Sequence, residues 1–303
     1  MENYVPMEKQ WERHPVRDFY HIYSDGTRVS VLFETPKDKV FARNLIAVLA
    51  FKYHVKVYCD VVMDTHLHLV AHGTPENIAC FETQLKRQMA MYFNQTGRSY
   101  LLKEKFEVTH EVICDDVELM QKIIYVFRNP MDAGYPYLPE DYPWGVGRLF
   151  FHPLPTDKGR KVADMTWRER VEAFRTQEIL PDEWEVDANG MLMPRCYIDV
   201  DGVRRLFGTP KRFIAFLHVK KKDLIDQETK CAQTFLEKRG DSELHAEAEA
   251  ESQRLFGRRV TKLTQAERIQ VAGLLWKERR TLSRKQLARA VRMNPDLIEA
   301  VFH

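Results

Sequence analysis

The sequence lacks several features that would place a protein in a large class. No stretch approaches the roughly 20 apolar residues of a membrane-spanning helix, so we expect no membrane association. The N-terminus has neither the charged nor the apolar region of a signal peptide. The five cysteines form no Cys-x-x-Cys pair, which argues against a disulfide framework or a zinc ribbon. We therefore predict a cytoplasmic protein in a reducing compartment.

The charge is small overall but unevenly distributed. The net charge of +2 says nothing by itself about nucleic acid. Residues 241–251 are acidic, whereas residues 254–292 hold 12 lysines and arginines against two glutamates. Charge of one sign gathered in one region is typical of a nucleic-acid-binding surface. A solvated helical region with no DNA role is the alternative.

The apolar pattern of the first 150 residues predicts alternating strands and helices. The expected strands cover residues 16–23, 28–33, 55–63, 66–72 and 106–113, and the expected helices cover 37–53, 75–94 and 117–128. Pro130 and Gly134 are expected to end the third helix. This order predicts an α+β fold with a β-α-β-β-α-β core of the ferredoxin-like type and one extra helix.

The rest of the chain is predicted to be mostly helical. We expect a short amphipathic helix over residues 165–180, a turn at 187–190 and a hairpin-like stretch over 197–203. From Pro210 onward the pattern is helical. Residues 282–302 form two short helical runs broken at 293–295, which is typical of a helix-turn-helix. The predicted DNA-binding residues at this end are Arg284, Lys285, Arg289 and Arg292.

Two histidines mark the centre of the first domain. His66 and His68 lie in a β-rich stretch, and residues i and i+2 of a strand point to the same face. Two imidazoles side by side can bind a divalent metal if a third ligand arrives from elsewhere. Two partly buried polar side chains without a metal are the alternative.

The third helix supplies a candidate for that ligand. Tyr125 and Asn129 are one helical turn apart and face the same way. Asn129 can offer a carbonyl oxygen to the metal, and Tyr125 would then be a nucleophile beside it. In the alternative interpretation, Asn129 is a helix C-cap before Pro130 and Tyr125 is one of 12 tyrosines.

Four stretches, in order and at compatible spacing, resemble the HUH single-tyrosine transposases, and most closely the REP-associated tyrosine transposases. Residues 63–68 resemble the family's Met-Pro-Asn/Asp-His-x-His turn and strand. Residues 125–134 resemble its helix motif Tyr-Ile-x-x-Asn-Pro-x-x-Ala-Gly, and residues 141–144 keep its Asp-Tyr-Pro-Trp. Residues 92–99 resemble the end of the helix after the histidines, and the likeness runs over about residues 19–150.

The chain departs from the family pattern in two places. Asp64 and Thr65 stand where the family has its proline, and Asp64 either binds metal or caps the turn. Residues 101–105 replace a Gly-His-Leu-Trp-Gln-like stretch, so the family's DNA contacts there are not expected to carry over.

The resemblance implies a chemistry and a division into domains. It implies that His66, His68 and Asn129 bind Mg²⁺ or Mn²⁺, and that Tyr125 attacks single-stranded DNA to leave a 5′-phosphotyrosine. No ATP is needed, in agreement with the absence of a Gly-x-x-x-x-Gly-Lys-Ser/Thr loop. The predicted parts are an HUH domain (1–155), a mixed connecting region (156–209) and a helical basic DNA-binding region (210–303).

The expected partner is single-stranded and hairpin DNA. Further predicted DNA contacts come from basic residues with an aromatic among them: Lys86, Arg87, Tyr92 and Arg98. Tyr135 is the next candidate for the nucleophile. The alternatives are a repeat-DNA-binding regulator without turnover and a metal-dependent hydrolase that uses water. The sequence leaves open whether the protein is a monomer or a homodimer.

Overall fold

A computed structural model of the chain describes residues 14–24, 31–103, 106–150, 158–218, 241–278, 282 and 284–302. Its first part contains four strands and four helices: β1 (Pro15–Ser24), α1 (Pro36–Lys52), β2 (Lys56–Val62), β3 (Leu67–His72), α2 (Pro75–Gln95), α3 (Tyr100–Lys103), β4 (Val108–Asp115) and α4 (Asp116–Asp132). The strands form one antiparallel sheet in the order β2-β3-β1-β4. This confirms the predicted α+β class.

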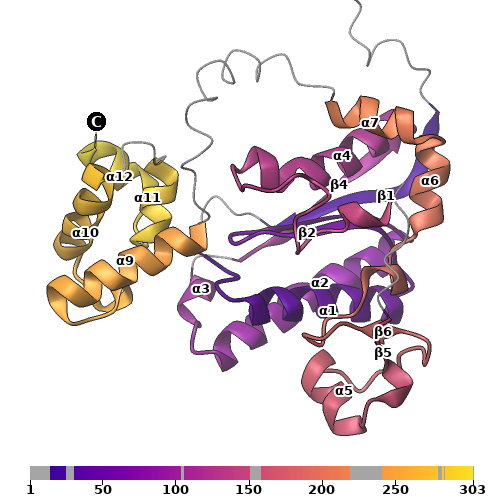
Figure 1. The fold of residues 1–303 in the computed structure, drawn as a ribbon, viewed down its shortest axis with the longest axis horizontal. Helices are drawn as coiled ribbons and strands as arrows, with labels where there is room; N and C mark the ends of the chain where they lie inside the picture. The colour runs from indigo at the N-terminus through magenta and orange to yellow at the C-terminus, as the bar shows by residue number, and fades with distance from the viewer. Residues whose placement is uncertain are drawn as a thin grey trace, which may run out of the picture.

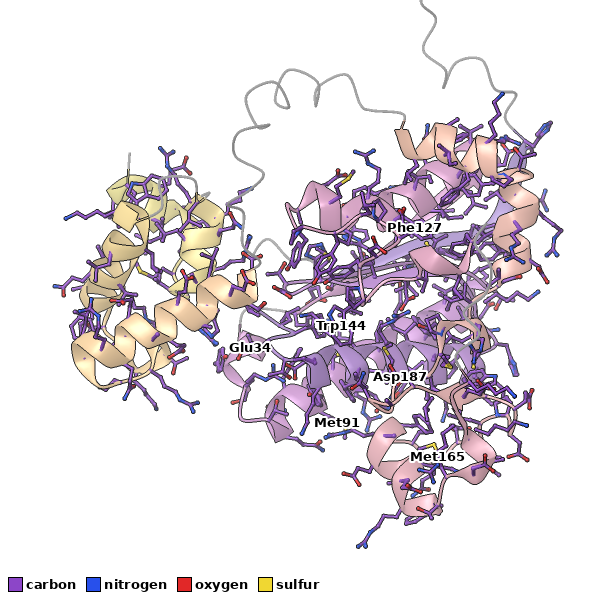
Figure 2. The ribbon with its side chains drawn as sticks, viewed as in Figure 1. Glu34, Met91, Phe127, Trp144, Met165 and Asp187 are labelled. Atoms are coloured by element: carbon purple, nitrogen blue, oxygen red, sulfur yellow. The ribbon has the colours of Figure 1, made fainter. Side chains whose placement is uncertain are left out.

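The two faces of the sheet are covered by different helices. Figure 1 shows α1 and α2 on one face and α4 on the other. Leu67 and Leu69 of β3 are fully buried, and the alternating His68 points to the opposite face, where its ring contacts Tyr125 of α4. Phe127 of α4, labelled in Figure 2, packs against Phe150 and against Phe213 of helix α7 (Pro210–His218). The strand period therefore separates an apolar face from a face with polar groups.

Helix α4 begins where expected but ends later. The Asp115 side chain accepts a hydrogen bond from the Glu118 amide, as an N-cap residue does. Pro130 lies inside the helix, which continues to Asp132 before Gly134 turns the chain with φ of +85°. The predicted break at Pro130 is therefore wrong, whereas the predicted end near Gly134 is confirmed. Because the helix continues past Pro130, Asn129 lies inside the helix.

The strand predicted over residues 28–33 is also wrong for its described part. Residues 28–30 lie outside the described residues, and 31–33 form no strand. The amides of Leu32 and Phe33 instead both donate to the Asp64 carbonyl, at 2.8 and 2.9 Å. A single acceptor outside any strand satisfies both amides, so no ladder forms there.

Residues 158–197 pack against the outer side of α1. The segment contains β5 (Arg160–Lys161), η3 (Val162–Asp164), α5 (Trp167–Phe174), β6 (Glu185–Val186) and η4 (Pro194–Cys196). Ala47 and Val48 of α1 share an apolar cluster with it. Asn44 of α1 donates to the carbonyls of Ala173 and Gly190 and accepts from the Leu192 amide. This explains why α1 is buried on nearly all sides.

The segment after residue 197 differs from expectation. The hairpin-like stretch predicted over 197–203 is wrong, because α6 (Val200–Phe207) forms there and Asp199 caps it by accepting from the Gly202 amide at 2.8 Å. The predicted turn is confirmed, because Gly190 has φ of +76° and its amide donates to the Asp187 carbonyl. Helix α7 (Pro210–His218) joins the sheet core through Phe216.

The C-terminal helices have an apolar cluster of their own. They are α9 (Asp241–Phe256), η6 (Val260–Lys262), α10 (Gln265–Glu278), α11 (Arg284–Ala290) and α12 (Pro295–Val301). The two helical runs expected near the end are confirmed as α11 and α12, with Asn294 as N-cap of α12. No helix in the described part of the chain is both long and apolar enough to cross a bilayer.

Candidate metal and nucleophile site

The structure brings His66, His68 and Asn129 together. His66 lies just before β3, and its Nε2 is 3.0 Å from Oδ1 of Asn129 in α4. Its Nδ1 is 2.8 Å from the Thr65 hydroxyl, which fixes the ring orientation. The His66 and His68 ring centroids are 4.8 Å apart. Asn129 is thus directed at the histidines instead of capping a helix end.

His66 Nε2 and Asn129 Oδ1 form a hydrogen bond, and their separation also equals that of two neighbouring ligands on a divalent metal. Two neighbouring ligands of an octahedral ion with bonds of about 2.1 Å lie about 3.0 Å apart. Burial, together with His66, His21 and Lys122, lowers the pKa of His68 well below its usual value, so the ring is neutral, as a metal ligand must be. Among the described residues, no group of three or more His, Cys, Asp or Glu is arranged to hold a metal.

Tyr125 is the accessible hydroxyl beside these groups. Its side chain is 44% exposed, and its ring meets those of His68 and His21 nearly edge-on, at centroid distances of 5.3 and 5.7 Å. Burial raises the pKa of Tyr125, and a hydrogen bond with the Asn129 side chain opposes that rise. The phenol is therefore protonated at neutral pH and needs assistance to act as a nucleophile.

His21 of β1 is a site residue that sequence reasoning missed. Its Nε2 is 3.2 Å from His68 Nδ1, and the two rings stack at a centroid distance of 5.2 Å. On its other side, its Nδ1 is 3.6 Å from a carboxylate oxygen of Glu111 in β4. Burial lowers the pKa of His21 to about 4. The position of His21 beside His68 follows from the strand order, in which β1 lies between β3 and β4.

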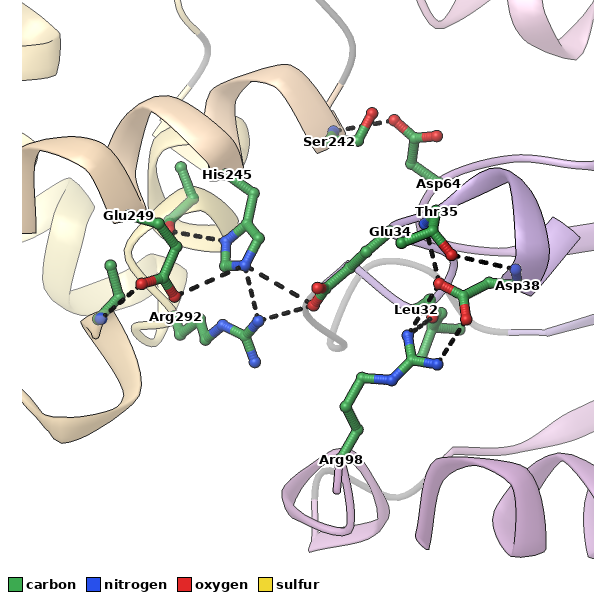
Figure 3. A network of polar contacts seen from close by, with 12 residues as sticks. Leu32, Glu34, Thr35, Asp38, Asp64, Arg98, Ser242, His245, Glu249 and Arg292 are labelled. Carbon is green, nitrogen blue, oxygen red and sulfur yellow. Dashed lines mark hydrogen bonds and ion pairs between the residues drawn. The ribbon is translucent and has the colours of Figure 1, made fainter. Parts of the chain in front are cut away.

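Asp64 does not face the histidines. Its buried carboxylate is 2.7 Å from Lys39 Nζ and accepts from the Ser242 amide, in the first turn of α9, at 2.9 Å (Figure 3). Burial raises and Lys39 lowers the pKa of Asp64, and the net shift is downward. Of the two roles left open for Asp64, the structure supports neither a metal ligand nor a simple turn cap. Tyr135, the second nucleophile candidate, is a poor one, because burial and Asp64 raise its pKa strongly.

Two of the predicted DNA contacts, Tyr92 of α2 and Arg98 just after this helix, are engaged inside the protein. Tyr92 is buried, stacks on Phe41 at a centroid distance of 3.9 Å and donates to Asp38 at 2.6 Å. Arg98 donates to both carboxylate oxygens of Asp38 and to the Leu32 carbonyl (Figure 3). Neither side chain can reach a base or a phosphate in this arrangement, so both predictions are corrected.

Arg292 is also engaged inside the molecule. Its side chain is buried, stacks over the Tyr100 ring at 4.5 Å and lies 2.8 Å from both Glu34 and His245 (Figure 3). These contacts join α9 and the turn before α12 to the sheet domain. Arg292 therefore holds the C-terminal helices against the sheet domain, and the prediction that it contacts DNA is corrected.

Arg289 and Arg284 differ in their availability. Arg289 binds both carboxylate oxygens of Asp241, at 3.0 and 2.9 Å, and its role as a DNA contact is corrected for the same reason. Arg284 pairs with Glu299 at 3.3 Å, and both of these side chains are at the surface. A surface ion pair contributes little free energy, so a DNA phosphate can replace Glu299 as the partner of Arg284.

The other predicted basic residues lie at the surface. Lys86 forms an ion pair with Glu107 in which both side chains are about half exposed. Arg87 of α2 and Lys285 of α11 are exposed. Contacts of Lys86, Arg87, Arg284 and Lys285 with DNA remain predictions.

Comparisons with known proteins add little. No protein-family profile matches the chain, and no curated protein matches it. A solved structure described as a REP-associated tyrosine transposase bound to a REP hairpin aligns with 14% sequence identity and a TM-score of 0.31. The alignment covers 45% of this chain and 80% of that chain. A TM-score of this size does not establish a shared fold.

Proposed function

We propose that the protein is a metal-dependent single-tyrosine enzyme that nicks and rejoins single-stranded DNA beside hairpins. The observation that carries this proposal is the meeting of Asn129 and His66 at 3.0 Å, with Tyr125 one helical turn from Asn129 and in ring contact with His68. A strand pair of histidines and a helix pair of Asn and Tyr come from separate parts of the sequence. The motif resemblance independently assigns these four residues to one site.

We further propose that the sheet domain is ferredoxin-like and of the HUH type. The order β1-α1-β2-β3-α2-β4 and the antiparallel sheet β2-β3-β1-β4 support this assignment. The domain limits 1–155, 156–209 and 210–303 belong to the same proposal.

The mechanism assigns one task to each side chain. His66, His68 and Asn129 would hold Mg²⁺ or Mn²⁺, which when bound neutralises charge on the phosphate. The Tyr125 oxygen attacks phosphorus and the bond to the 3′-oxygen breaks, which leaves a 5′-phosphotyrosine. The phenol proton is lost and the leaving 3′-oxygen gains one, giving a 3′-hydroxyl. The same 3′-hydroxyl, or another, reverses the step and releases the enzyme.

The exposed basic residues would bind the DNA outside the reacting phosphate. We assign the hairpin stem to the C-terminal helices, because residues 254–292 hold 12 lysines and arginines against two glutamates. Arg284 and Lys285 are the α11 residues at the surface for this role, and Lys86 and Arg87 would contact the single strand. Phosphate contacts of this kind position the DNA without reading its sequence.

Covalent trapping tests the proposal. The full chain is incubated with Mg²⁺ or Mn²⁺ and end-labelled single-stranded DNA that carries a palindrome, and adducts are separated by denaturing electrophoresis. Wild type and the Tyr23→Phe control should form the adduct, and Tyr125→Phe should not, while it still binds the DNA. Tyr23 is a suitable control because its ring also lies beside His68.

Each alternative gives a different result. A hydrolase that uses water would cut DNA equally well in Tyr125→Phe and would form no adduct in wild type. A regulator without turnover would bind the hairpin but leave the strand intact. An adduct that persists in Tyr125→Phe would show that another tyrosine is the nucleophile.

A further inference from the structure

A line of polar groups runs from His68 through His21 to Glu111. His68 Nδ1 is 3.2 Å from His21 Nε2, and His21 Nδ1 is 3.6 Å from Glu111 Oε2. The three residues come from β3, β1 and β4, which are adjacent strands. His21 and His68 are buried, whereas the Glu111 side chain is about half exposed. The line therefore leads from a buried imidazole to a carboxylate at the surface.

The chemistry of imidazole gives this line a direction. A neutral histidine has one nitrogen that donates and one that accepts. If Glu111 is ionised it can only accept, so the proton of His21 belongs on Nδ1 and its Nε2 is an acceptor. His68 must then donate from Nδ1, which leaves its Nε2 without a proton. An unprotonated Nε2 is what a metal ligand requires.

We propose that His21 and Glu111 are positioning residues that fix the tautomer and orientation of His68, so that its Nε2 is the metal-binding atom. This inference rests on the metal site of the proposed function. A partner that accepts from the second nitrogen of a ligand histidine also increases the basicity of the nitrogen that binds metal.

Two other side chains also contact Glu111. Lys122 of α4 pairs with Glu111, and the Tyr23 hydroxyl is 3.5 Å from its other oxygen. His21 Nδ1 is a buried nitrogen without a hydrogen bond at the 3.6 Å separation from Glu111. A hydrogen bond from Nδ1 to this carboxylate is therefore part of the proposal. A buried donor left unpaired is unfavourable, so a purely apolar packing role would be better served by leucine.

Two measurements on the full chain test the inference. The first is the tautomer of His68 in metal-free protein, read from its imidazole ¹⁵N chemical shifts. The second is the affinity for Mn²⁺ alone, measured by titration. The variants are His21→Leu, His21→Gln, Glu111→Gln, Lys122→Met as a control that keeps the carboxylate, and His68→Ala as a reference for loss of the site.

Wild type should show His68 protonated on Nδ1. In His21→Leu that preference should be lost, and Mn²⁺ affinity should fall by about tenfold to a hundredfold. His21→Gln places an amide oxygen near the position of Nε2 and should restore most of both properties. Glu111→Gln tests whether the carboxylate fixes the tautomers, without altering the core. It should weaken the preference of His68 for a proton on Nδ1, whereas Lys122→Met should not.

The outcomes separate this inference from the proposed function. If His68→Ala binds Mn²⁺ as tightly as wild type, the proposed metal site itself is wrong. If His68→Ala loses the metal while His21→Leu and Glu111→Gln retain wild-type affinity and tautomer, only the positioning role is overturned. Should His21→Leu fail to fold, the Glu111→Gln and Lys122→Met pair decides the question.

Discussion

At the scale of single residues, hydrogen-bond partners decide what each side chain in the sheet domain can do. Arg98 and Tyr92 both bind Asp38, and all three are largely buried. Burial raises the pKa of Asp38, but hydrogen bonds from Arg98 and then Tyr92 outweigh it, so the net shift in pKa is downward. The cluster therefore depends on a charge that the protein keeps ionised in its interior.

Replacing Arg98 should destabilise the fold in a pH-dependent way. Arg98→Met leaves a buried carboxylate uncompensated, which should lower the free energy of unfolding by about 3 kcal/mol at pH 7. In wild type the lowered pKa contributes stability above the unfolded pKa of about 3.9, and this is lost as pH falls through the folded pKa. In the variant the pKa of Asp38 rises. The difference in the free energy of unfolding between wild type and Arg98→Met should therefore become smaller towards pH 4.

Urea unfolding at pH 7 and near pH 4 measures this difference. Arg87→Met, at an exposed position on the preceding helix α2, is the control and should change stability by less than about 0.5 kcal/mol. An Arg98→Met effect that is equal at both pH values would show that packing, and not charge, explains the loss.

The metal ligands should respond to Mn²⁺ differently from the nucleophile. Because a metal supplies several kcal/mol and each 1.36 kcal/mol is tenfold, His66→Ala should reduce cleavage by at least about a hundredfold. Excess Mn²⁺ should restore part of that activity by mass action at the weakened site. It should restore none to Tyr125→Phe. Equal rescue of both variants, measured as initial rates of nicking, would contradict the separate roles.

The site residues found from the sequence share a property. Tyr125 and Asn129 are paired by spacing within α4, and His66 and His68 by spacing at the start of β3, and such spacing is visible without a fold. His21 needed the pairing of β1 with β3, which no local pattern shows. Tyr92 was wrongly predicted to contact DNA, because a helical sequence pattern does not show whether an aromatic residue beside basic residues is buried in the core.

At the scale of elements, some features were again predicted from the local sequence, while others depended on packing against distant parts of the chain. The start of α4 was predicted to within one residue, whereas its continuation through Pro130 depends on packing against the sheet. The segment at 31–33 looked like a strand because it is apolar, but it is buried by irregular backbone bound to the Asp64 carbonyl. Apolar composition predicted burial correctly and secondary structure wrongly.

The N-cap of α4 should contribute measurably to stability. Asp115→Ala removes the acceptor for the Glu118 amide and a negative charge near the helix N-terminus, so we expect a loss of about 1 kcal/mol in urea unfolding. Asp132→Ala at the other end of α4 breaks only an i,i+4 pair with Arg128 and should change stability by less than about 0.5 kcal/mol. Equal losses at the two ends would exclude a capping effect.

At the scale of the whole molecule, the C-terminal helices keep an apolar cluster of their own and dock on the sheet domain through polar contacts. Ser242 reaches Asp64, two residues before His66, and Arg292 reaches Glu34. The charge of this region was evident from the sequence. Which arginines face inward was not, because the acidic partners come from distant parts of the chain.

The basic surface of α11 should govern how hairpin binding depends on salt. Each phosphate contact to duplex DNA contributes about 0.9 to the slope of log affinity against log salt. Replacing Arg284 and Lys285 together by glutamine should therefore flatten the slope by about 1.8 and weaken hairpin binding, while nicking of short single strands persists. The matched control replaces Arg204 and Arg205 of α6, which are also adjacent basic residues at the surface. Fluorescence anisotropy over a salt series gives both slopes, and an unchanged slope in the α11 variant would make this face a solvated surface without a DNA role.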